Sequence, residues 1–456
     1  MVIFREQKKY EKNTVDETLW ESIGKVNFSV KVGFAVDIGT TTVVVTAVDF
    51  ERKKIIGTLS QTNEQTKLGA DVMMRIMHCM SGRGEILHRM IIQQIEEMAG
   101  QLWGKGKLEE MQGEQCLFFV VGNTTMCHLF LDKSVEGLAG YPFWPAYQGN
   151  YRCIGREVGM EYFAQAKICV LSGIAAHVGA DALAVIGAER LYQKDRVQLA
   201  VDLGTNAEII LNQKGKLRVC STAAGPAFEG KGISCGMAAK AGAVAEVKIA
   251  AGNGNIILGM LEGEEPAGIC SSGLVDLLAQ LRRCKLLLKD GYLLGCSEAE
   301  GAGIPKQLCS RLVTRKEQNA FLLCGAEEGK REIYLLQSDI RNLQLAKAAI
   351  QAGIISILAS AQISLREVDE FVVAGVLGSC VRKTSAVSIG LFPEAVSERV
   401  RLAGNAAGRG AVFGVLDSAF SENLEKLAQG ILHIEIAQEK GFQDCLMKSM
   451  DIQSWL

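Results

Sequence analysis

The chain has 456 residues and a formal net charge of −2, so charge gives no argument for binding nucleic acid or an anionic membrane. Its length exceeds what one hydrophobic core usually supports and predicts two or three domains. It is 48% apolar, with 49 glycines and only 6 prolines, which is typical of a compact α/β enzyme with many tight turns.

The cysteines show no metal-binding or disulfide signature. All 14 are scattered through the chain, and no C-x-x-C pair or ferredoxin-type cluster occurs. Residues 1–20 are polar and charged, unlike a secretory signal, and the closest approach to a membrane span, residues 171–188, contains His177 and Asp181. These features predict reduced thiols in a cytoplasmic protein that holds no iron–sulfur cluster and crosses no membrane.

The first strand follows an N-terminal extension, residues 1–31, which is charged and has no phosphate motif. Residues 34–49 read F-A-V-D-I-G-T-T-T-V-V-V-T-A-V-D, a pattern of strand, tight turn and strand. A glycine in the turn lets the backbone approach a ligand, and the turn's N–H groups and hydroxyls would form an anion-binding concavity. The Asp37 carboxylate at the strand end is placed to hold a hydrated Mg²⁺ ion. The residues predicted to bind phosphate are Gly39, Thr40, Thr41 and Thr42.

A second copy of this pattern begins the second half of the chain. Residues 199–210 read L-A-V-D-L-G-T-N-A-E-I-I, so the D-x-G-T string recurs. This repeat predicts two similar halves, residues 32–197 and 198–456, that clamp a polyphosphate and its metal, with the C-terminal helix packing back on the first half. Two ordinary hairpins are the alternative, because Asp-x-Gly also simply makes turns. The predicted ligands are Asp202 for the metal and Gly204, Thr205 and Asn206 for the phosphates.

Four further segments carry local signals. A buried strand at residues 117–121 ends at Gly122-Asn123-Thr124, at the carboxyl end where open α/β sheets bind ligands. His128 follows, and we predict a hydrogen-bonded buried histidine in preference to a metal ligand. Gly225 lies in a glycine-rich turn, and Gly273 opens a helix whose amino end is a natural anion site. Residues 339–358 have the apolar spacing of a long helix.

Several strings resemble a known superfamily. D-I-G-T-T-T and D-L-G-T-N are similar to the two phosphate motifs of the actin, sugar-kinase, acetate-kinase and DnaK-type chaperone (ASKHA) superfamily. More narrowly, G-A-D-V, V-V-G-N-T-T-M, V-G-A-D-A-L and C-S-T-A-A-G-P-A-F-E-G resemble the ATPase domain of the reductive activators of corrinoid proteins. The likeness spans about residues 33–443. Larger members of that family carry an N-terminal ferredoxin domain, for which this chain has neither the room nor the cysteines.

The resemblance implies a fold, cofactors and partners. It implies two actin-like (ribonuclease H-like) lobes with mixed β-sheets flanked by helices, and ATP in the cleft between them. Asp37 and Asp202 would organise Mg²⁺ through water. The partner would be a corrinoid protein, and a separate iron–sulfur protein would supply the electron. The protein itself is expected to form a homodimer. A superfamily carboxylate often positions the attacking nucleophile, a role for which Asp181, Glu208 and Glu229 compete.

The segment after residue 370 resembles the superfamily's adenosine motif, in which Gly375, Gly378 and Ser379 would let the backbone lie against the purine and ribose. The family tends to have glycine where Val376 stands, so either this turn differs or nucleotide affinity is weakened. Ser271 also stands where the family usually has glycine, which puts close backbone approach to a ligand there in question.

Three functions therefore remain open. The first is an ATPase that drives reductive reactivation of a corrinoid protein. The second is a small-molecule kinase on the same fold, which needs a polar acceptor pocket that the sequence does not reveal. The third is a nucleotide-gated binding module with little turnover, suggested by Val376.

Overall fold

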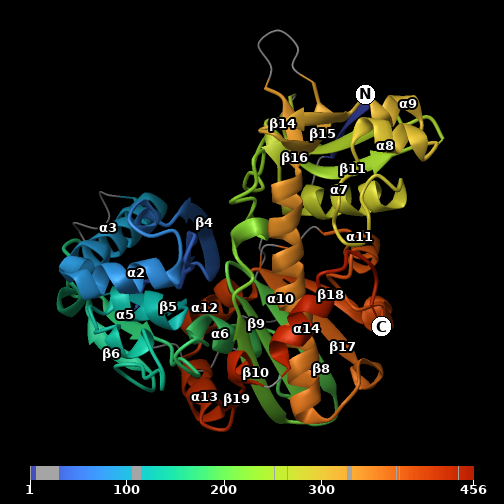
Figure 1. The fold of residues 1–456 in the computed structure, drawn as a ribbon. Coiled ribbons are helices and arrows are strands. Elements are labelled where there is room, and N and C mark those ends of the chain that lie inside the picture. Colours follow the sequence, from blue (N-terminus) through green and yellow to red (C-terminus); the bar gives the residue numbers. More distant parts are fainter. Residues whose placement is uncertain are drawn as a thin grey trace.

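The computed structural model describes residues 2–6, 30–104, 115–250, 252–263, 265–325, 331–375, 377–378, 381–439 and 441–455. These residues form two α/β lobes, with a smaller subdomain above the second lobe (Figure 1). The first lobe is blue to cyan in Figure 1, and the long helix α10 (Gln337–Ala361) runs from the small subdomain into the second lobe.

The first lobe is built on a six-stranded sheet in the order β4-β3-β2-β5-β7-β6. Strand β3 pairs antiparallel with both β2 and β4, whereas β2, β5 and β7 run parallel. Strands β2 and β5 are central and read as nearly continuous apolar runs because both of their faces are covered. The strands are β2 (Val32–Ile38), β3 (Thr42–Asp49), β4 (Lys54–Thr62), β5 (Cys116–Gly122), β6 (Tyr151–Ile154) and β7 (Lys167–Val170). The helices of this part of the chain are η1 (Glu64–Lys67), α2 (Val72–His78), the π-helical η2 (Cys79–Arg83), α3 (Gly84–Trp103), α5 (Thr124–Phe130), η3 (Glu136–Leu138), η4 (Gly155–Val158) and α6 (Ala180–Ala188).

The second lobe repeats this topology in five strands, but its sixth strand, β19, pairs with β10, whereas β6 of the first lobe pairs with β7. Its sheet has the order β18-β17-β8-β9-β10-β19. Strands β8, β9 and β10 are antiparallel neighbours, and β8, β17 and β18 run parallel, as β2, β5 and β7 do. The predicted actin-like fold with two similar halves is confirmed. The strands are β8 (Val197–Leu203), β9 (Ala207–Gln213), β10 (Lys216–Thr222), β17 (Glu370–Gly375), β18 (Val400–Gly404) and β19 (Leu432–His433).

The small subdomain holds two further sheets. One has the order β1-β12-β11-β13, and β1, from the predicted N-terminal extension, pairs parallel with β12. The other, β14-β15-β16, is antiparallel and begins within the turn-rich stretch that follows residue 290. The strands are β1 (Val2–Glu6), β11 (Ala243–Ile249), β12 (Ile256–Leu261), β13 (Gly268–Ile269), β14 (Leu312–Arg315), β15 (Gln318–Cys324) and β16 (Ile333–Leu336). The helices are η5 (Pro226–Glu229), α7 (Ser271–Arg283), α8 (Cys296–Gly301) and α9 (Lys306–Cys309).

Helix α10 confirms the long helix predicted from apolar spacing. Among the described residues it is the helix whose length and composition would suffice to cross a membrane, but 78% of its most apolar window is buried inside the protein. It is therefore the core helix of the second lobe. The remaining helices are η6 (Leu365–Glu367), α11 (Lys383–Ser388), η7 (Glu394–Arg399), α12 (Ala406–Leu416), α13 (Ser418–Ala428), η8 (Ile436–Gln438) and α14 (Phe442–Lys448).

The two halves exchange helices. Helix α12 follows the last parallel strand of the second lobe but packs on strands β2 and β5 of the first. A Cβ on Gly414 would lie 2.3 Å from the Phe119 ring, and one on Gly410 would lie 2.4 Å from the Ala184 carbonyl oxygen of α6. The helices that return to the first lobe are thus α12 and α13. The expectation for the C-terminal helix was wrong, because α14 lies against α10.

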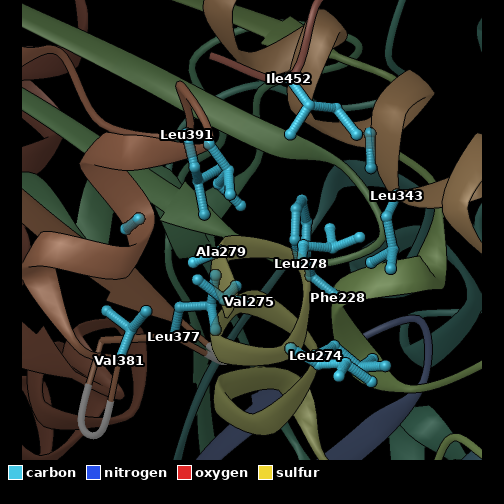
Figure 2. Packing of buried hydrophobic residues seen from close by; sticks show 14 of the residues in the cluster. Phe228, Leu274, Val275, Leu278, Ala279, Leu343, Leu377, Val381, Leu391 and Ile452 are labelled. Atoms are coloured by element: carbon cyan, nitrogen blue, oxygen red, sulfur yellow. The ribbon is translucent and has the colours of Figure 1, made fainter. Parts of the chain in front are cut away.

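An apolar cluster anchors the loops that face the cleft. Figure 2 shows Leu274, Val275 and Leu278 of α7 near Leu343 of α10 and Leu377. Leu377 lies between the two glycines of the predicted adenosine motif and is fully buried. The same cluster holds Phe228, next to the candidate base Glu229. Packing in this cluster therefore fixes the turn around Leu377 and the segment around Phe228, both of which the sequence predicted to lie at the nucleotide site.

Candidate nucleotide site

The first predicted hairpin turns tightly between β2 and β3. The Gly39 N–H donates to the Thr42 carbonyl oxygen at 2.9 Å. A Cβ on Gly39 would lie 2.7 Å from that oxygen, a contact that only glycine avoids. Thr42 itself begins β3 and pairs with Thr62 of β4. The turn proper is therefore residues 39–41, and its backbone has the tight form that a phosphate cradle needs.

Side chains from three distant segments hold this turn from behind. Arg75 of α2 is fully buried and donates to the Thr40 carbonyl oxygen. Asn123, after β5, donates to Thr40 Oγ1 at 2.9 Å, and Asn63 donates to the Gly39 carbonyl oxygen at 2.8 Å. Burial lowers the pKa of Arg75 to about 10, so the guanidinium remains charged at neutral pH. A fixed positive charge therefore backs the predicted phosphate turn.

The second hairpin meets the first across the cleft. The hydroxyl oxygens of Thr41 and Thr205 are 3.2 Å apart. Thr205 donates its hydroxyl to Glu229 Oε1 at 2.8 Å, so Thr41 is the donor in the bond between the lobes. The Gly204 N–H closes the second turn by donating to the Asn206 carbonyl oxygen at 2.9 Å. Both predicted phosphate turns thus present their hydroxyls at one point.

Four mutually repelling carboxylates lie around the hairpins. Burial, with the charge of Asp181 added, raises the pKa of Asp37 to about 7. Burial and then the charges of Asp181 and Asp37 raise the pKa of Asp202 to about 8. Burial raises the pKa of Asp181 to about 6 and that of Glu208 well above its usual range, where Asp181 and Asp202 also contribute. All four can be ionised together only if a cation neutralises them.

The interlobe helix α12 contributes to the same cluster. Asn405, which caps α12, hydrogen-bonds the Asp37 side chain and opposes the rise in its pKa. Gly375 ends β17 with a φ of 77°, and a Cβ there would lie 2.7 Å from Asp202 Oδ1. The Gly404 N–H donates to the Gly378 carbonyl oxygen at 2.8 Å. The predicted adenosine-motif glycines therefore allow β17 and β18 to approach the second hairpin closely.

Three other predicted residues have different outcomes. The Gly225 N–H donates to the Thr205 carbonyl oxygen at 2.8 Å, which brings Gly225 to the second hairpin. Gly273 lies in α7, where a Cβ would be 2.1 Å from the Val244 carbonyl oxygen, so close packing on β11 explains this glycine. Its role in anion binding stays a prediction. Ser379 and Val376 lie outside the described residues.

Lys231 is a cleft residue that the sequence did not indicate. It follows η5, and its N–H donates to the Pro226 carbonyl oxygen at 3.2 Å. Burial lowers the pKa of Lys231, Glu229 opposes that shift, and the charge of Arg75 adds to it. Because Arg75 belongs to the first lobe, Lys231 and Arg75 place two positive charges near the hairpins from opposite sides. Lys231 directly follows the C-S-T-A-A-G-P-A-F-E-G string, but that string assigns it no role, so its position relative to Arg75 comes from the fold.

The donor set fits a hydrated divalent ion. Within the described residues, no three His, Cys, Asp or Glu side chains are grouped to ligate a metal directly. Asp37 and Asp202 are instead paired carboxylates at equivalent strand ends, held in a cluster that needs a counter-charge. Mg²⁺ usually keeps several waters and is bound by one or two carboxylates plus phosphates. Asp37 and Asp202 would hold such an ion through its water.

His128 is a structural residue, as predicted. It is 1% exposed, its Nε2 accepts from the Ala146 N–H at 2.9 Å, and its Nδ1 lies 2.7 Å from the Thr124 carbonyl oxygen. The proton is therefore on Nδ1. The cysteines of the described residues are free thiols.

Comparison with known proteins agrees with this geometry. Residues 32–194 match the family model of the RACo middle region, and residues 196–455 match that of the C-terminal domain of RACo, the ASKHA domain. The chain is 31% identical over 420 residues to the corrinoid activation enzyme RamQ of Eubacterium limosum, covering 91% of this chain and 69% of that protein. It is 25% identical over 429 residues to the Co(II) methylated amine-specific corrinoid protein reductase of Methanosarcina barkeri, covering 90% of this chain and 75% of that protein.

A solved structure of a reductive activator for corrinoid, iron-sulfur protein superposes with a TM-score of 0.83 at 31% identity, over 94% of this chain and 67% of that one. The two facing hairpins and the helix exchange described above thus lie in segments that match the family throughout. The chain belongs to the RACo family of corrinoid-activating enzymes and contains its middle region and its ASKHA domain.

Proposed function

We propose that this protein binds Mg·ATP between its lobes and uses hydrolysis to drive the reductive activation of a corrinoid protein, with the electron supplied by a separate iron–sulfur protein. The observation that carries the proposal is the cross-lobe bond between Thr41 and Thr205, which lies among the partly buried carboxylates Asp37 and Asp202. A polyphosphate inserted at this point would touch both lobes at once. Its presence and its hydrolysis would therefore bias the relative position of the lobes.

The chain's own groups have separable roles in this scheme. The backbone N–H groups and hydroxyls of the two turns would hold the phosphates, supported by Arg75 behind Thr40. Bound Mg²⁺ would neutralise charge on the phosphates and keep Asp37 and Asp202 ionised. Lys231 would add positive charge from the second lobe. Opening of the lobes would then require the Thr41–Thr205 contact or its phosphate bridge to break.

Among the three base candidates, Asp181 fits best. A general base must be ionised before it accepts a proton from water. Burial raises the pKa of Asp181 only to about 6, so Asp181 is ionised at neutral pH, whereas burial raises the pKa of Glu208 well above its usual range. Glu229 already accepts the Thr205 hydroxyl. We therefore assign the positioning of the attacking water to Asp181.

Phosphate release, measured with and without a Co(II) corrinoid protein, tests the proposal. We expect slow hydrolysis alone and faster hydrolysis with the partner, and typical coupling of ~1–3 kcal/mol between nucleotide and partner binding. Asp181→Asn should lower the rate ~100-fold or more, with the exposed Asp195→Asn as the matched control. Hydrolysis that ignores every corrinoid protein tested, with phosphate transferred to a sugar or carboxylic acid instead, would overturn the proposal.

The kinase alternative receives less support. A cavity of about 670 Å³ opens in the described part of the chain, but none of Asp37, Asp181, Asp202, Glu208 or Glu229 lines it. A phosphoryl acceptor bound there would not contact the carboxylates that surround the two hairpins. The free thiols of the described cysteines favour a reducing compartment, so a cytoplasmic location, like the homodimer, stays part of this proposal.

A further inference from the structure

The cavity of about 670 Å³ lies beside the nucleotide site but is separate from it. One side of it is formed by Thr124, Cys127 and His128 after β5, by residues 172–176 after β7, and by Ala180 at the start of α6. These are the carboxyl ends of parallel strands, where α/β sheets bind ligands. Residues 425–438, from the second half of the sequence, complete its wall. The volume lies within the range typical of small-molecule sites.

Aromatic side chains dominate one wall. Tyr141, Phe143, Trp144 and Tyr147 all line the cavity from a single loop. Tyr141 and Trp144 are 75% and 66% exposed, so they stand at its rim and are open to a ligand. The Tyr147 ring lies 4.8 Å from the ring of His128, and the Tyr141 and Phe143 rings meet edge to face at 6.2 Å. The wall thus offers several aromatic rings to a ligand.

The charged groups of the cavity have one sign. Glu425 and Glu435 line it, and no lysine or arginine is found among its described lining residues. Glu425 accepts a hydrogen bond from the Asn150 N–H at 2.8 Å, which fixes this carboxylate beside the cavity. The lining imidazoles of His128 and His433 are uncharged at neutral pH, because burial lowers the pKa of each. The local potential therefore favours a cation.

We propose that this cavity binds a small organic cation of the substituted-ammonium class, held by the faces of Tyr141 and Trp144 and by the carboxylates of Glu425 and Glu435. A positive charge over an aromatic face is attracted by the ring quadrupole, and quaternary ammonium groups are recognised in this way. A neutral ligand of equal size would gain the same contact area but no such attraction. An anion would be repelled by both carboxylates.

Titration calorimetry with choline on the full chain tests this site. The neutral analogue 3,3-dimethyl-1-butanol has the same shape without the charge and should bind ~10-fold more weakly. Trp144→Ala and Glu435→Gln should each weaken choline binding ~10-fold. Tyr162→Ala and Glu422→Gln are matched controls, because both residues are exposed and neither lines the cavity, and they should leave the affinity within about twofold.

A charge insertion separates lost binding from lost folding. Gln438 is exposed and lines the cavity, so Gln438→Lys should supply a competing cation and block choline while leaving the melting temperature unchanged. Equal affinity for choline and its neutral analogue, no binding of choline at millimolar concentration, or a folded Gln438→Lys protein with unchanged affinity would each overturn the proposal.

Discussion

Replacing Asp202 with asparagine should stabilise the nucleotide-free protein at alkaline pH and remove Mg²⁺-dependent nucleotide binding. Burial, with Asp181 and Asp37, raises the pKa of this carboxyl from 3.8 to about 8. Between these values the folded protein keeps a proton that the unfolded chain releases. The contribution of Asp202 to stability is therefore full below pH 3.8 and is lost as the pH rises through about 8.

The magnitude follows from the size of the shift. Each pKa unit corresponds to about 1.4 kcal/mol, so a rise of about four units gives an upper limit of ~6 kcal/mol. Asp202 is only partly buried and shares its repulsion with Asp37 and Asp181, so water and neighbouring groups reduce this limit. We expect Asp202→Asn to gain ~2–3 kcal/mol at about pH 8.5, or ~5 °C in the melting temperature of a lobe of this size.

Differential scanning calorimetry from about pH 5.5 to 9, with and without Mg·ATP, measures this effect. The exposed Asp195→Asn is the control and should follow the wild type throughout. In the wild type, Mg·ATP should restore the stability that alkaline pH removes, because the ion neutralises the cluster. An Asp202→Asn protein that melts below the wild type at high pH, or that still gains stability from Mg·ATP but not from ATP alone, would refute the reasoning.

Two other predictions concern groups around the cleft, and a third concerns the cysteines. Arg75→Lys should weaken ATP binding ~10-fold in calorimetry, because an ammonium group cannot donate to the Thr40 and Gly69 carbonyl oxygens with the fixed geometry of a guanidinium. Unchanged affinity would mean that the first phosphate turn keeps its conformation without Arg75. Lys231→Gln should raise the Kd for ATP more than that for AMP, with the exposed Lys240→Gln as control, whereas equal weakening of both nucleotides would count against a phosphate role. Elemental analysis of anaerobically purified protein should find neither iron nor zinc in stoichiometric amount, and either metal would contradict the interpretation of the scattered cysteines.

The fold was predictable because its signals are local and repeated. The apolar strand, the glycine turn and the β-branched strand that follows lie within about sixteen residues, and the second copy indicates the pseudo-symmetry of the lobes. The apolar spacing of α10 likewise lies in one continuous segment. Strand β1 was missed because its partner β12 lies more than 200 residues away, and nothing in its sequence specifies that pairing.

The site was predictable only in its glycines, hydroxyls and strand-end carboxylates. Arg75, Asn405 and Lys231 reach the hairpins from segments that look like an ordinary helix, a helix cap and a loop. Their positions depend on contacts between segments far apart in the chain, and no local pattern in a single sequence indicates such contacts. Gly273 illustrates an ambiguity that the sequence leaves open, since a glycine at a helix start is compatible with anion binding and with close packing.

The packing of α12 on the first lobe has a consequence for folding during synthesis. The face of Phe119 in β5 is covered by Gly414, which leaves the ribosome roughly 200 residues after the first lobe ends, a delay of roughly 10–40 s at ordinary rates of synthesis. Until then the nascent first lobe carries an exposed apolar surface. A fragment that ends near residue 197 should accordingly aggregate when expressed alone and become soluble when residues 198–456 are supplied on a second chain.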